Sequence, residues 1–418
     1  MRKKHFLFAS VLALLCGSST LHAQDFKLTS SGYFKNQGVD VMAFDDIYPE
    51  GHQGGVCIIM NGHRVATNGD IRLEATPGQW QPVPKQLDRK LGDNSITATL
   101  CYPDSSRHLT GFNPMIYPDL HLIYTVNVES KGKNIEVTVD LDRPIPQEFI
   151  GKVGFNLEFF PGSLFGKPWI MDGQSGIFPQ QPNSPLMTTQ PNYLHTGNYH
   201  DGKKSLADMN KLIGKGYSPI VADDIISEPY AKGTKFTSRP DDPYNKVTIE
   251  SLSGDLQLFD GRMNHNNGWF VLRSNIKPGV TKGAVKWIIT PNVVADWMYQ
   301  PVIQTSQIGY HPAQDKEAVI EMDIRDNRKE TAQIIRIDAD GEKVVKNVTP
   351  ANWGKFLRYN YLKVDFTDVK EPGLYKIKYD TSVSPIFRID NDVYARGVWQ
   401  PVLEYFLPVQ MCHMRVNE

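Results

Sequence analysis

The chain has 418 residues, of which 40% are hydrophobic and 22% are charged. This composition is typical of a globular protein with a full core, and the length is typical of two or three domains. The 45 Lys and Arg residues balance 46 Asp and Glu residues, so the net charge is -1. This balance excludes the basic field with which proteins hold nucleic acids or anionic membranes, and it favours an uncharged partner.

The N-terminal residues 1–23 have the features of a secretory signal peptide. Basic residues at 2–4 precede an apolar run at 6–15, and the small-residue cleavage pattern at 21–23 predicts a mature start at Gln24. The apolar run is too short to cross a bilayer, which takes about 20 residues. We therefore expect export to the periplasm, the cell surface or the medium.

The cysteines give no disulfide framework, because Cys57, Cys101 and Cys412 are an odd set once the signal peptide is removed. Cys57 and Cys101 lie in strand-like runs, and we interpret them as buried thiols, with a bridge between them as the alternative. Lipidation of Cys16 is a further alternative, although Leu15 is larger than lipoprotein processing normally accepts. No zinc-ligand spacing occurs, and we expect neither a metal nor a cofactor.

Residues 24–298 alternate between apolar and polar side chains with period two, which predicts antiparallel strands with one buried face. Residues 124–141, with a polar turn at 131–134, predict a hairpin, and 247–258 repeat the pattern. The proline-rich stretch 178–200 predicts a long loop. Strands joined by short polar turns predict a large β-sandwich of uncertain role.

Residues 300–390 predict a second, smaller sandwich, because short strands alternate with turns every 8 to 12 residues, as in immunoglobulin-like domains. In residues 391–418 the apolar period changes to that of a helix, which Asp390 or Asn391 can cap. Two prolines are expected to kink or restart this helix. Its apolar stripe consists of Tyr394, Val398, Val402, Tyr405 and Phe406.

The densest polar and aromatic cluster contains Asp260, Arg262, Asn264 and Trp269. Sugar sites combine an aromatic platform with planar hydrogen-bonding groups, so these four residues are our candidate substrate-binding site. The alternative is that Asn264 lies in a simple turn and Trp269 packs in the core at the start of the next strand.

Residues 304–390 resemble the N-terminal immunoglobulin-like domain of family-nine glycoside hydrolases, the cellulase and endoglucanase group. The resemblance rests on Ser-Gln-Ile-Gly-Tyr-His-Pro at 306–312, Pro-Gly-Leu-Tyr at 372–375 and Pro-Ile-Phe-Arg-Ile at 385–389. The run 155–161 in turn resembles the large β-supersandwich modules of several carbohydrate enzymes. The resemblance therefore implies an all-β chain, with a large sandwich followed by an immunoglobulin-like one.

The tail, with Tyr394, Tyr405 and Gln-Met-Cys at 410–412, resembles the first helix of that family's (α/α)6 catalytic barrel. The family commonly has Gln-Arg-Cys at this position, so Gln-Met-Cys in this chain bears only on the assignment to a subfamily. A single amphipathic helix is marginal in water. We therefore expect its packing partners, the rest of a helical catalytic domain, to lie beyond Glu418.

The family implies inverting hydrolysis of β-1,4-glucans of the cellulose or xyloglucan type, with one carboxylic acid and one carboxylate base. The family's base lies in an Asp-x-Gly-Asp motif. The Gly-Asp pairs ending at Asp70, Asp93 and Asp255 have no aspartate at the required offset, so we expect no catalytic residue in this chain.

These observations predict an exported accessory region of a glycoside hydrolase, with a β-glucan as partner and the chain itself inactive. The alternative is a non-enzymatic exported protein that binds polysaccharide or is purely structural. An Asp-x-Gly-Asp motif in a continuation of the gene beyond Glu418 distinguishes the first from the second.

Overall fold

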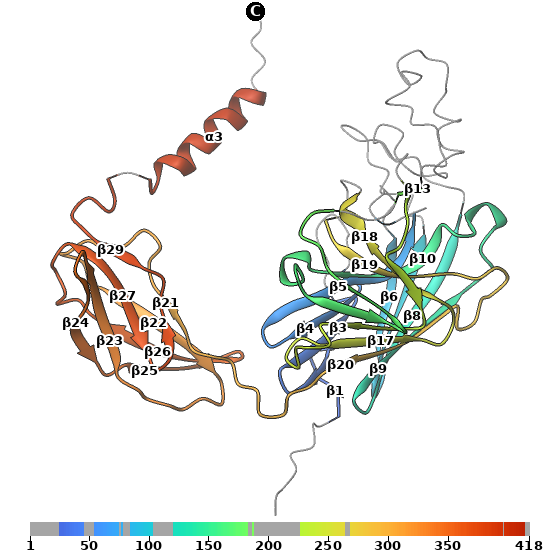
Figure 1. The fold of residues 1–418 in the computed structure, drawn as a ribbon, viewed down its shortest axis with the longest axis horizontal. Coiled ribbons are helices and arrows are strands. Elements are labelled where there is room, and N and C mark those ends of the chain that lie inside the picture. Colours follow the sequence, from blue (N-terminus) through green and yellow to red (C-terminus); the bar gives the residue numbers. More distant parts are fainter. Residues whose placement is uncertain are drawn as a thin grey trace, which may run out of the picture. The chain divides into compact units, whose positions relative to one another are not determined.

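The computed structural model describes residues 25–45, 54–74, 77, 84–102, 120–182, 186–187, 226–263, 268–395 and 397–413. The chain divides into two compact units, Met1–Trp297 and Met298–Glu418, shown as ribbons in Figure 1. The all-β class predicted from the sequence is confirmed. Within the described part, no helix is long and apolar enough to cross a membrane. The predicted signal peptide lies outside the described residues.

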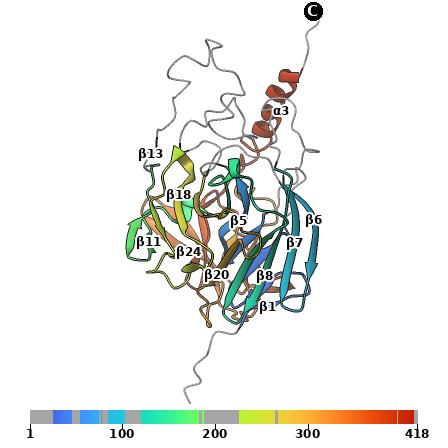
Figure 2. The same cartoon turned by 90° about the vertical axis from the view of Figure 1, so that its right-hand side faces the viewer.

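The described strands of the larger unit form two nine-stranded sheets, which we name sheet 1 and sheet 2, and a separate pair of short strands. Figure 2 shows β6, β7 and β8 of sheet 2 side by side. The order in sheet 1 is β1 (Lys27–Leu28), β2 (Phe34–Asn36), β3 (Val39–Ala43), β4 (Val56–Met60), β5 (His63–Leu73), β10 (Val153–Phe159), β19 (Phe270–Asn275), β18 (Leu256–Asp260), β15 (Ala231–Gly233). The order in sheet 2 is β12 (Gln174–Ile177), β11 (Pro168–Met171), β16 (Lys235–Ser238), β17 (Val247–Ser251), β20 (Val285–Pro291), β9 (Asn134–Leu141), β8 (Leu122–Lys131), β7 (Ser95–Tyr102), β6 (Lys85–Leu91); the pair is β13 (Leu186–Met187) and β14 (Ile226–Ser227).

The two sheets share one apolar core, in which Trp287 of β20 is the largest fully buried side chain. Its ring lies edge-on to Phe155 of β10, with centroids 5.0 Å apart, and its indole nitrogen donates to Ser274 Oγ of β19 at 3.0 Å. Trp287 therefore joins sheet 2 to sheet 1 by both packing and a hydrogen bond.

The hairpin predicted at 124–141 is confirmed: β8 pairs with β9 in antiparallel register across the turn at Gly132 and Lys133. The hairpin predicted at 247–258 is wrong, because β17 belongs to sheet 2 and β18 to sheet 1. Residues 252–255 carry the chain from one sheet to the other. Alternation shows that each strand has one buried face. The same alternation occurs whether two consecutive strands pair in one sheet or lie in opposite sheets of the sandwich.

Cys57 of β4 is buried and Cys101 of β7 is partly buried, and they form no disulfide. β4 lies in sheet 1 and β7 in sheet 2. The interpretation as thiols within strands is confirmed for both, but only Cys57 is buried as expected. Cys16 lies outside the described residues.

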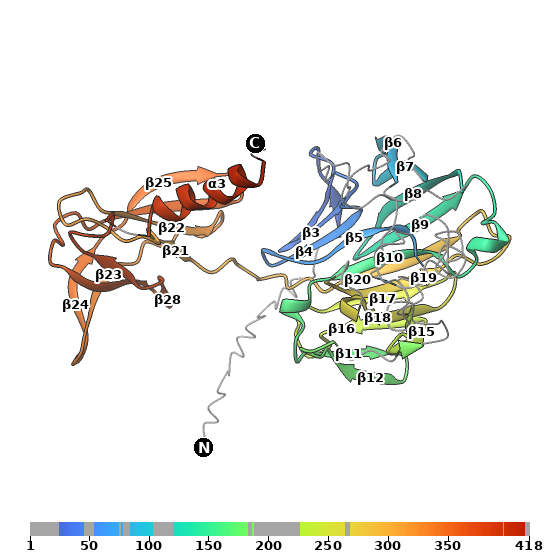
Figure 3. The ribbon, with the colours of Figure 1, turned by 90° about the horizontal axis from the view of Figure 1, so that it is seen from above.

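The second unit is an immunoglobulin-like sandwich of two sheets, which we name sheet 3 and sheet 4; Figure 3 shows it from above. Its core contains Tyr310, Phe366 and Phe387, whose rings meet at centroid distances of 5.1 to 5.5 Å. β25 was not predicted, since its sequence lacks clear alternation. Sheet 3 is β21 (Val302–Gln304), β22 (Glu317–Asp323), β26 (Tyr359–Asp365), β25 (Ala351–Phe356), and sheet 4 is β24 (Gly341–Val348), β23 (Ala332–Asp338), β27 (Gly373–Tyr379), β28 (Ser382–Val383), β29 (Phe387–Ile389).

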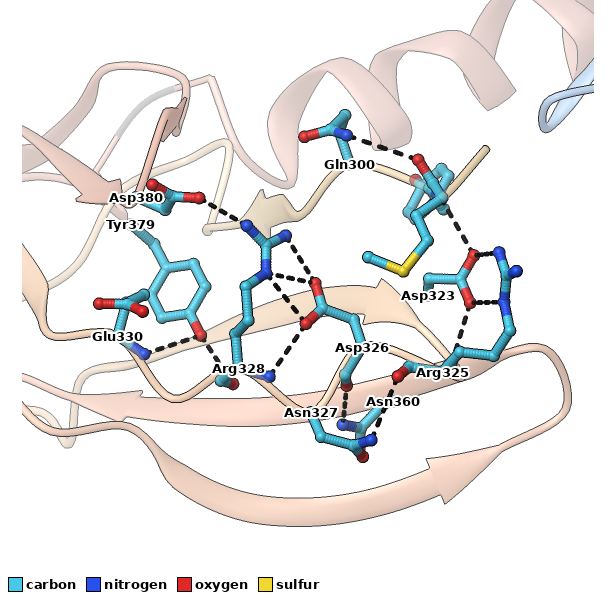
Figure 4. A network of polar contacts seen from close by, with 12 residues as sticks. Gln300, Asp323, Arg325, Asp326, Asn327, Arg328, Glu330, Asn360, Tyr379 and Asp380 are labelled. Carbon is cyan, nitrogen blue, oxygen red and sulfur yellow. Dashed lines mark hydrogen bonds and ion pairs between the residues drawn. The ribbon is translucent and has the colours of Figure 1, made fainter. Parts of the chain in front are cut away.

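Two Asp-x-Arg pairs fasten the segment that follows β22, as Figure 4 shows. Arg325 donates to both carboxylate oxygens of Asp323 at 2.8 Å, and Arg328 donates to Asp326 and to Asp380 at 2.6 Å. Burial alone would raise the pKa of Asp323, but its hydrogen bonds from Arg325 outweigh burial and lower the pKa to about 2. The start of the unit is thereby fixed, because Tyr299 N–H also donates to Asp323 at 3.1 Å.

Helix α3 (Gln400–His413) begins nine residues later than the predicted start at 391. Pro401 explains the delay, because proline fits the first turn of a helix, whereas in a helix interior it lacks the N–H that bonds to the preceding turn and its ring clashes with a carbonyl there. Tyr394 lies outside the helix, where its hydroxyl contacts Gln314 at 2.6 Å. The described side chains at 401–406 are exposed.

Substitution of Trp287 by alanine is expected to lower the free energy of unfolding of the larger unit by about 3 to 5 kcal/mol, because it leaves a cavity between two sheets. Chemical denaturation followed by circular dichroism measures this change. The control is Leu252→Ala, since Leu252 is 61% exposed in the same unit, with an expected change of about 0.5 kcal/mol or less. Equal losses in the two variants would contradict this account of the core.

Candidate functional site

The structure brings Asp260 and Arg262 together at the end of β18. Asp260 is fully buried, and Arg262, in the short 3-10 helix Gly261–Met263, donates from Nε and Nη2 to its two carboxylate oxygens at 2.8 Å. Tyr230 OH also donates to Asp260 Oδ2 at 3.0 Å. The carboxylate is therefore satisfied from within the protein.

The remaining contacts of Arg262 also lie within the protein. Its Nη1 donates to the carbonyl of Gln180 at 2.8 Å and its Nη2 to that of Pro179 at 2.9 Å. Its guanidinium carbon lies 4.5 Å from the ring centroid of Phe270 and 5.2 Å from that of Phe165. Arg262 thus ties the chain after β12 to the end of β18, and its geometry is that of a structural clamp.

Trp269 lies just before β19 and is partly buried. Its ring meets Phe160 edge-on, with centroids 4.4 Å apart, and Phe160 is itself 43% exposed. Asn264 lies outside the described residues. The four predicted residues are therefore not assembled into a described sugar site, and their role in binding substrate stays a prediction.

A second polar group, which sequence reasoning missed, lies on the central strands of sheet 1. The antiparallel register places Asp70 of β5, Asn156 of β10 and Arg273 of β19 side by side. We name the group the ionic cluster. Its members are Asp70, Arg72, Glu74, Asn156, Glu158 and Arg273.

Arg273 is the centre of the ionic cluster. Its Nη1 donates to Glu74 Oε1 at 3.1 Å and to Asn156 Oδ1 at 3.0 Å, and its Nη2 donates to the carbonyls of Glu74 and Lys152. Asn156 in turn donates to Glu74 Oε1 at 2.6 Å. These bonds satisfy a guanidinium that is only 1% exposed.

The cluster contains three carboxyl groups and two guanidinium groups, so full ionisation would bury a net negative charge. Burial raises the pKa of Asp70 to about 6, against the opposing attraction of Arg72. Burial likewise raises the pKa of Glu74 to about 7, against that of Arg273. Proton uptake near neutral pH relieves the charge imbalance. Carboxyl groups shifted in this way occur both in catalytic sites and in structural ion-pair networks.

A sequence pattern for this cluster exists. In 70–74 the residues Asp, Arg and Glu alternate with Ile and Leu, and Asn156 and Glu158 alternate with Phe155, Leu157 and Phe159. Such alternation ordinarily indicates a strand with one face in water. Here both faces are buried, and only the tertiary structure shows it. Among the residues that the structure describes, no group of His, Cys, Asp and Glu could hold a metal ion.

Residues 298–384 match the cellulase N-terminal ig-like domain, and this segment spans most of sheets 3 and 4. Residues 298–384 are therefore an immunoglobulin-like domain of the cellulase type, as the sequence predicted. No curated protein matches the chain.

Three solved structures are similar to parts of the chain. A metagenome-derived family 9 endoglucanase is 31% identical over 22% of this chain and 18% of its own, with a TM-score of 0.20. A family 9 glycoside hydrolase of Bacteroides ovatus is 26% identical over 22% and 16%, with a TM-score of 0.19. The Slr1438 protein of Synechocystis sp. PCC 6803 is 11% identical over 64% and 96%, with a TM-score of 0.28. The chain thus spans less than a fifth of the endoglucanase and of the Bacteroides protein.

Substitution of Arg262 by methionine is expected to destabilise the larger unit by about 3 kcal/mol, because Asp260 keeps a buried charge without its partner. The double change Asp260→Asn with Arg262→Met is expected to regain most of this loss, since no charge then remains. The control is Arg143→Met, which breaks a similar bond to Asp142 at 2.8 Å where the arginine side chain is 54% exposed; we expect about 1 kcal/mol or less. Denaturant titration measures all three, and an Arg262→Met chain as stable as the control would contradict the clamp.

The ionic cluster is expected to make the larger unit less stable as pH rises. The folded-state pKa values of Asp70 and Glu74, about 6 and about 7, lie above the ordinary values of 3.8 and 4.5 for these groups. The folded state therefore binds the protons more tightly, and this stabilisation is complete below about pH 4 and lost as pH rises through 6 and 7.

The measurement compares wild type with the Asp70→Asn/Glu74→Gln chain by denaturant titration at pH 5 and pH 8. We expect wild type to lose about 4 kcal/mol more than the variant over this interval, from the two carboxyl groups together. Parallel losses in the two chains would show that neither carboxyl group takes up a proton on folding.

Proposed function

We propose that this chain is the exported, N-terminal accessory region of a glycoside hydrolase that acts on β-1,4-glucans of the cellulose or xyloglucan type. The observation that carries the proposal is the cellulase-type immunoglobulin-like domain at 298–384. The signal-like residues 1–23 support export. The near-neutral charge of the chain suits an uncharged polysaccharide.

Helix α3 supports the position of a catalytic domain directly after the immunoglobulin-like domain. Its side chains Val402, Leu403, Tyr405 and Phe406 are between 52% and 69% exposed. A helix with such a surface is marginal alone in water, and contiguous exposed apolar side chains mark an interaction surface. In this proposal α3 packs against further helices of a catalytic barrel in the same polypeptide.

The position of the catalytic carboxyl groups decides which domain carries out hydrolysis in this proposal. Inverting hydrolysis needs an acid that protonates the leaving oxygen and a base that activates water, with the two groups about 6.5 to 9.5 Å apart around the bond that breaks. The sequence has no Asp-x-Gly-Asp motif. In the proposal both catalytic carboxyl groups belong to the helical domain, while the two sandwiches brace it.

The test measures release of reducing sugar from carboxymethyl cellulose, xyloglucan and mixed-linkage glucan. The purified 418-residue chain is expected to release none. A polypeptide extended through the Asp-x-Gly-Asp motif is expected to hydrolyse at least one of the three, and the matched variant with Asn in place of the motif's last Asp is expected to be inactive. Hydrolysis by the 418-residue chain, or none by the extended polypeptide, would contradict the proposal.

A further inference from the structure

The outer face of sheet 3 carries a group of aromatic side chains that the proposed function does not use. Trp353 is 55% exposed and Phe356 is 57% exposed, both on β25. Tyr359 and Tyr361 of β26 and Tyr299 before β21 are partly buried beside them. We name this group the aromatic face; its members are Tyr299, Trp353, Phe356, Tyr359 and Tyr361.

Strand register places these residues on one side of the sheet. Tyr359 pairs with Phe356 and Tyr361 pairs with Gly354, while Asn360 and Leu362, the alternate residues of β26, are buried on the other side. The register shifts between Asn352 and Gly354, at the position of Trp353. Gly354 has φ +123°, a conformation that L side chains rarely adopt, so this irregularity of β25 is specified by the sequence.

Four of the five rings are in contact, in the order Trp353, Tyr361, Tyr359 and Tyr299. Ring centroids are 5.6 Å apart for Trp353 and Tyr361, 6.0 Å for Tyr361 and Tyr359, and 5.3 Å for Tyr359 and Tyr299. An extended ligand that lies along this face therefore meets aromatic surface over several rings.

A carboxylate lies within the aromatic face. Glu321 of β22 accepts hydrogen bonds from Tyr299 OH at 3.0 Å and from Tyr361 OH at 3.3 Å. The backbone N–H of Tyr299 donates to Asp323. Arg325 in turn clamps Asp323, as Figure 4 shows, so the arrangement is fixed before any ligand arrives. Preorganised groups bind with less loss of conformational entropy.

Two ion pairs lie on this side of sheet 3. Lys363 lies 2.8 Å from Glu317, and Asp323 is paired with Arg325. The face therefore presents aromatic rings, phenol groups and one carboxylate that accepts hydrogen bonds, without a row of unpaired positive or negative charge. Its electrostatic complement is an uncharged ligand rich in hydroxyl groups.

We infer that the aromatic face binds a single β-1,4-glucan chain and so adds a substrate contact remote from the catalytic carboxyl groups. Pyranose rings offer apolar C–H faces that pack on aromatic rings, and their hydroxyl groups donate to carboxylates and phenols. The inference rests on the proposed function, which supplies the glucan. The aromatic rings and phenol groups of the face and its place in a cellulase-type domain favour a glucan over a second copy of the chain.

The experiment is affinity electrophoresis of the chain from Gln24 onward in gels with hydroxyethyl cellulose or xyloglucan, followed by titration calorimetry with cellohexaose. Wild type is expected to be retarded by at least one of the glucans. Trp353→Ala and Tyr361→Ala are each expected to weaken binding about tenfold, which corresponds to about 1.4 kcal/mol. Glu321→Gln is expected to weaken it to a smaller extent, because the amide keeps its shape and one acceptor.

The matched control is Tyr244→Ala, since Tyr244 is 47% exposed but lies in the larger unit. Circular dichroism and denaturant titration verify that each variant is folded. Retention of wild-type affinity by folded Trp353→Ala and Tyr361→Ala chains would overturn the inference, as would absence of retardation of wild type by every glucan. A dimer of the wild-type chain that Trp353→Ala dissociates would also overturn it, since the face would then bind a second copy.

The outcome separates this inference from the proposed function. If the extended polypeptide hydrolyses a glucan and Trp353→Ala binds glucan as wild type does, the proposed glycoside hydrolase is supported and the aromatic face is ruled out as a binding site. If glucan binding depends on Trp353 and the extended polypeptide hydrolyses none of the glucans, the aromatic face is supported as a binding site and the proposed hydrolase is contradicted.

Discussion

The larger unit depends on burying both faces of β10. All seven residues of Val153–Phe159 are buried. Phe155 packs against Trp287 in the core between the sheets, whereas Asn156 belongs to the ionic cluster with Arg273. A strand covered on both sides cannot leave its polar groups to water, so each must be paired within the protein. The charges of the neighbouring strands β5 and β19 supply those partners.

The fold was predictable wherever the sequence pattern is local. The hairpin of β8 and β9 follows from alternation and its turn, and the immunoglobulin-like unit follows from its strand spacing and its resemblance to a known domain. The separation of β17 and β18 into two sheets was not predictable, because alternation does not reveal the pairing partner. Helix α3 begins nine residues after the predicted start, next to Pro401, which is one of the two prolines at which a kink or restart was expected.

For the candidate sites, too, the sequence did not reveal which residues lie together in the fold. Asp260 and Arg262 were chosen for their chemistry, and the structure shows them bound to each other and to backbone carbonyls. The ionic cluster and the aromatic face consist of residues brought together by register between strands, and Glu321 and Tyr361 are 40 positions apart in sequence. Sequence reasoning identifies residue types, but strand pairing and sheet closure decide which of them meet.

The proposed function is that the two sandwiches serve a catalytic domain which they do not contain. Determination of the reading frame that follows Glu418, from the genome and from the transcript, tests this claim most directly. The account predicts a continuous frame that encodes further amphipathic helices, an Asp-x-Gly-Asp motif and a glutamate near its end. A stop codon directly after Glu418 would contradict it and would favour an exported protein that binds polysaccharide without cleaving it.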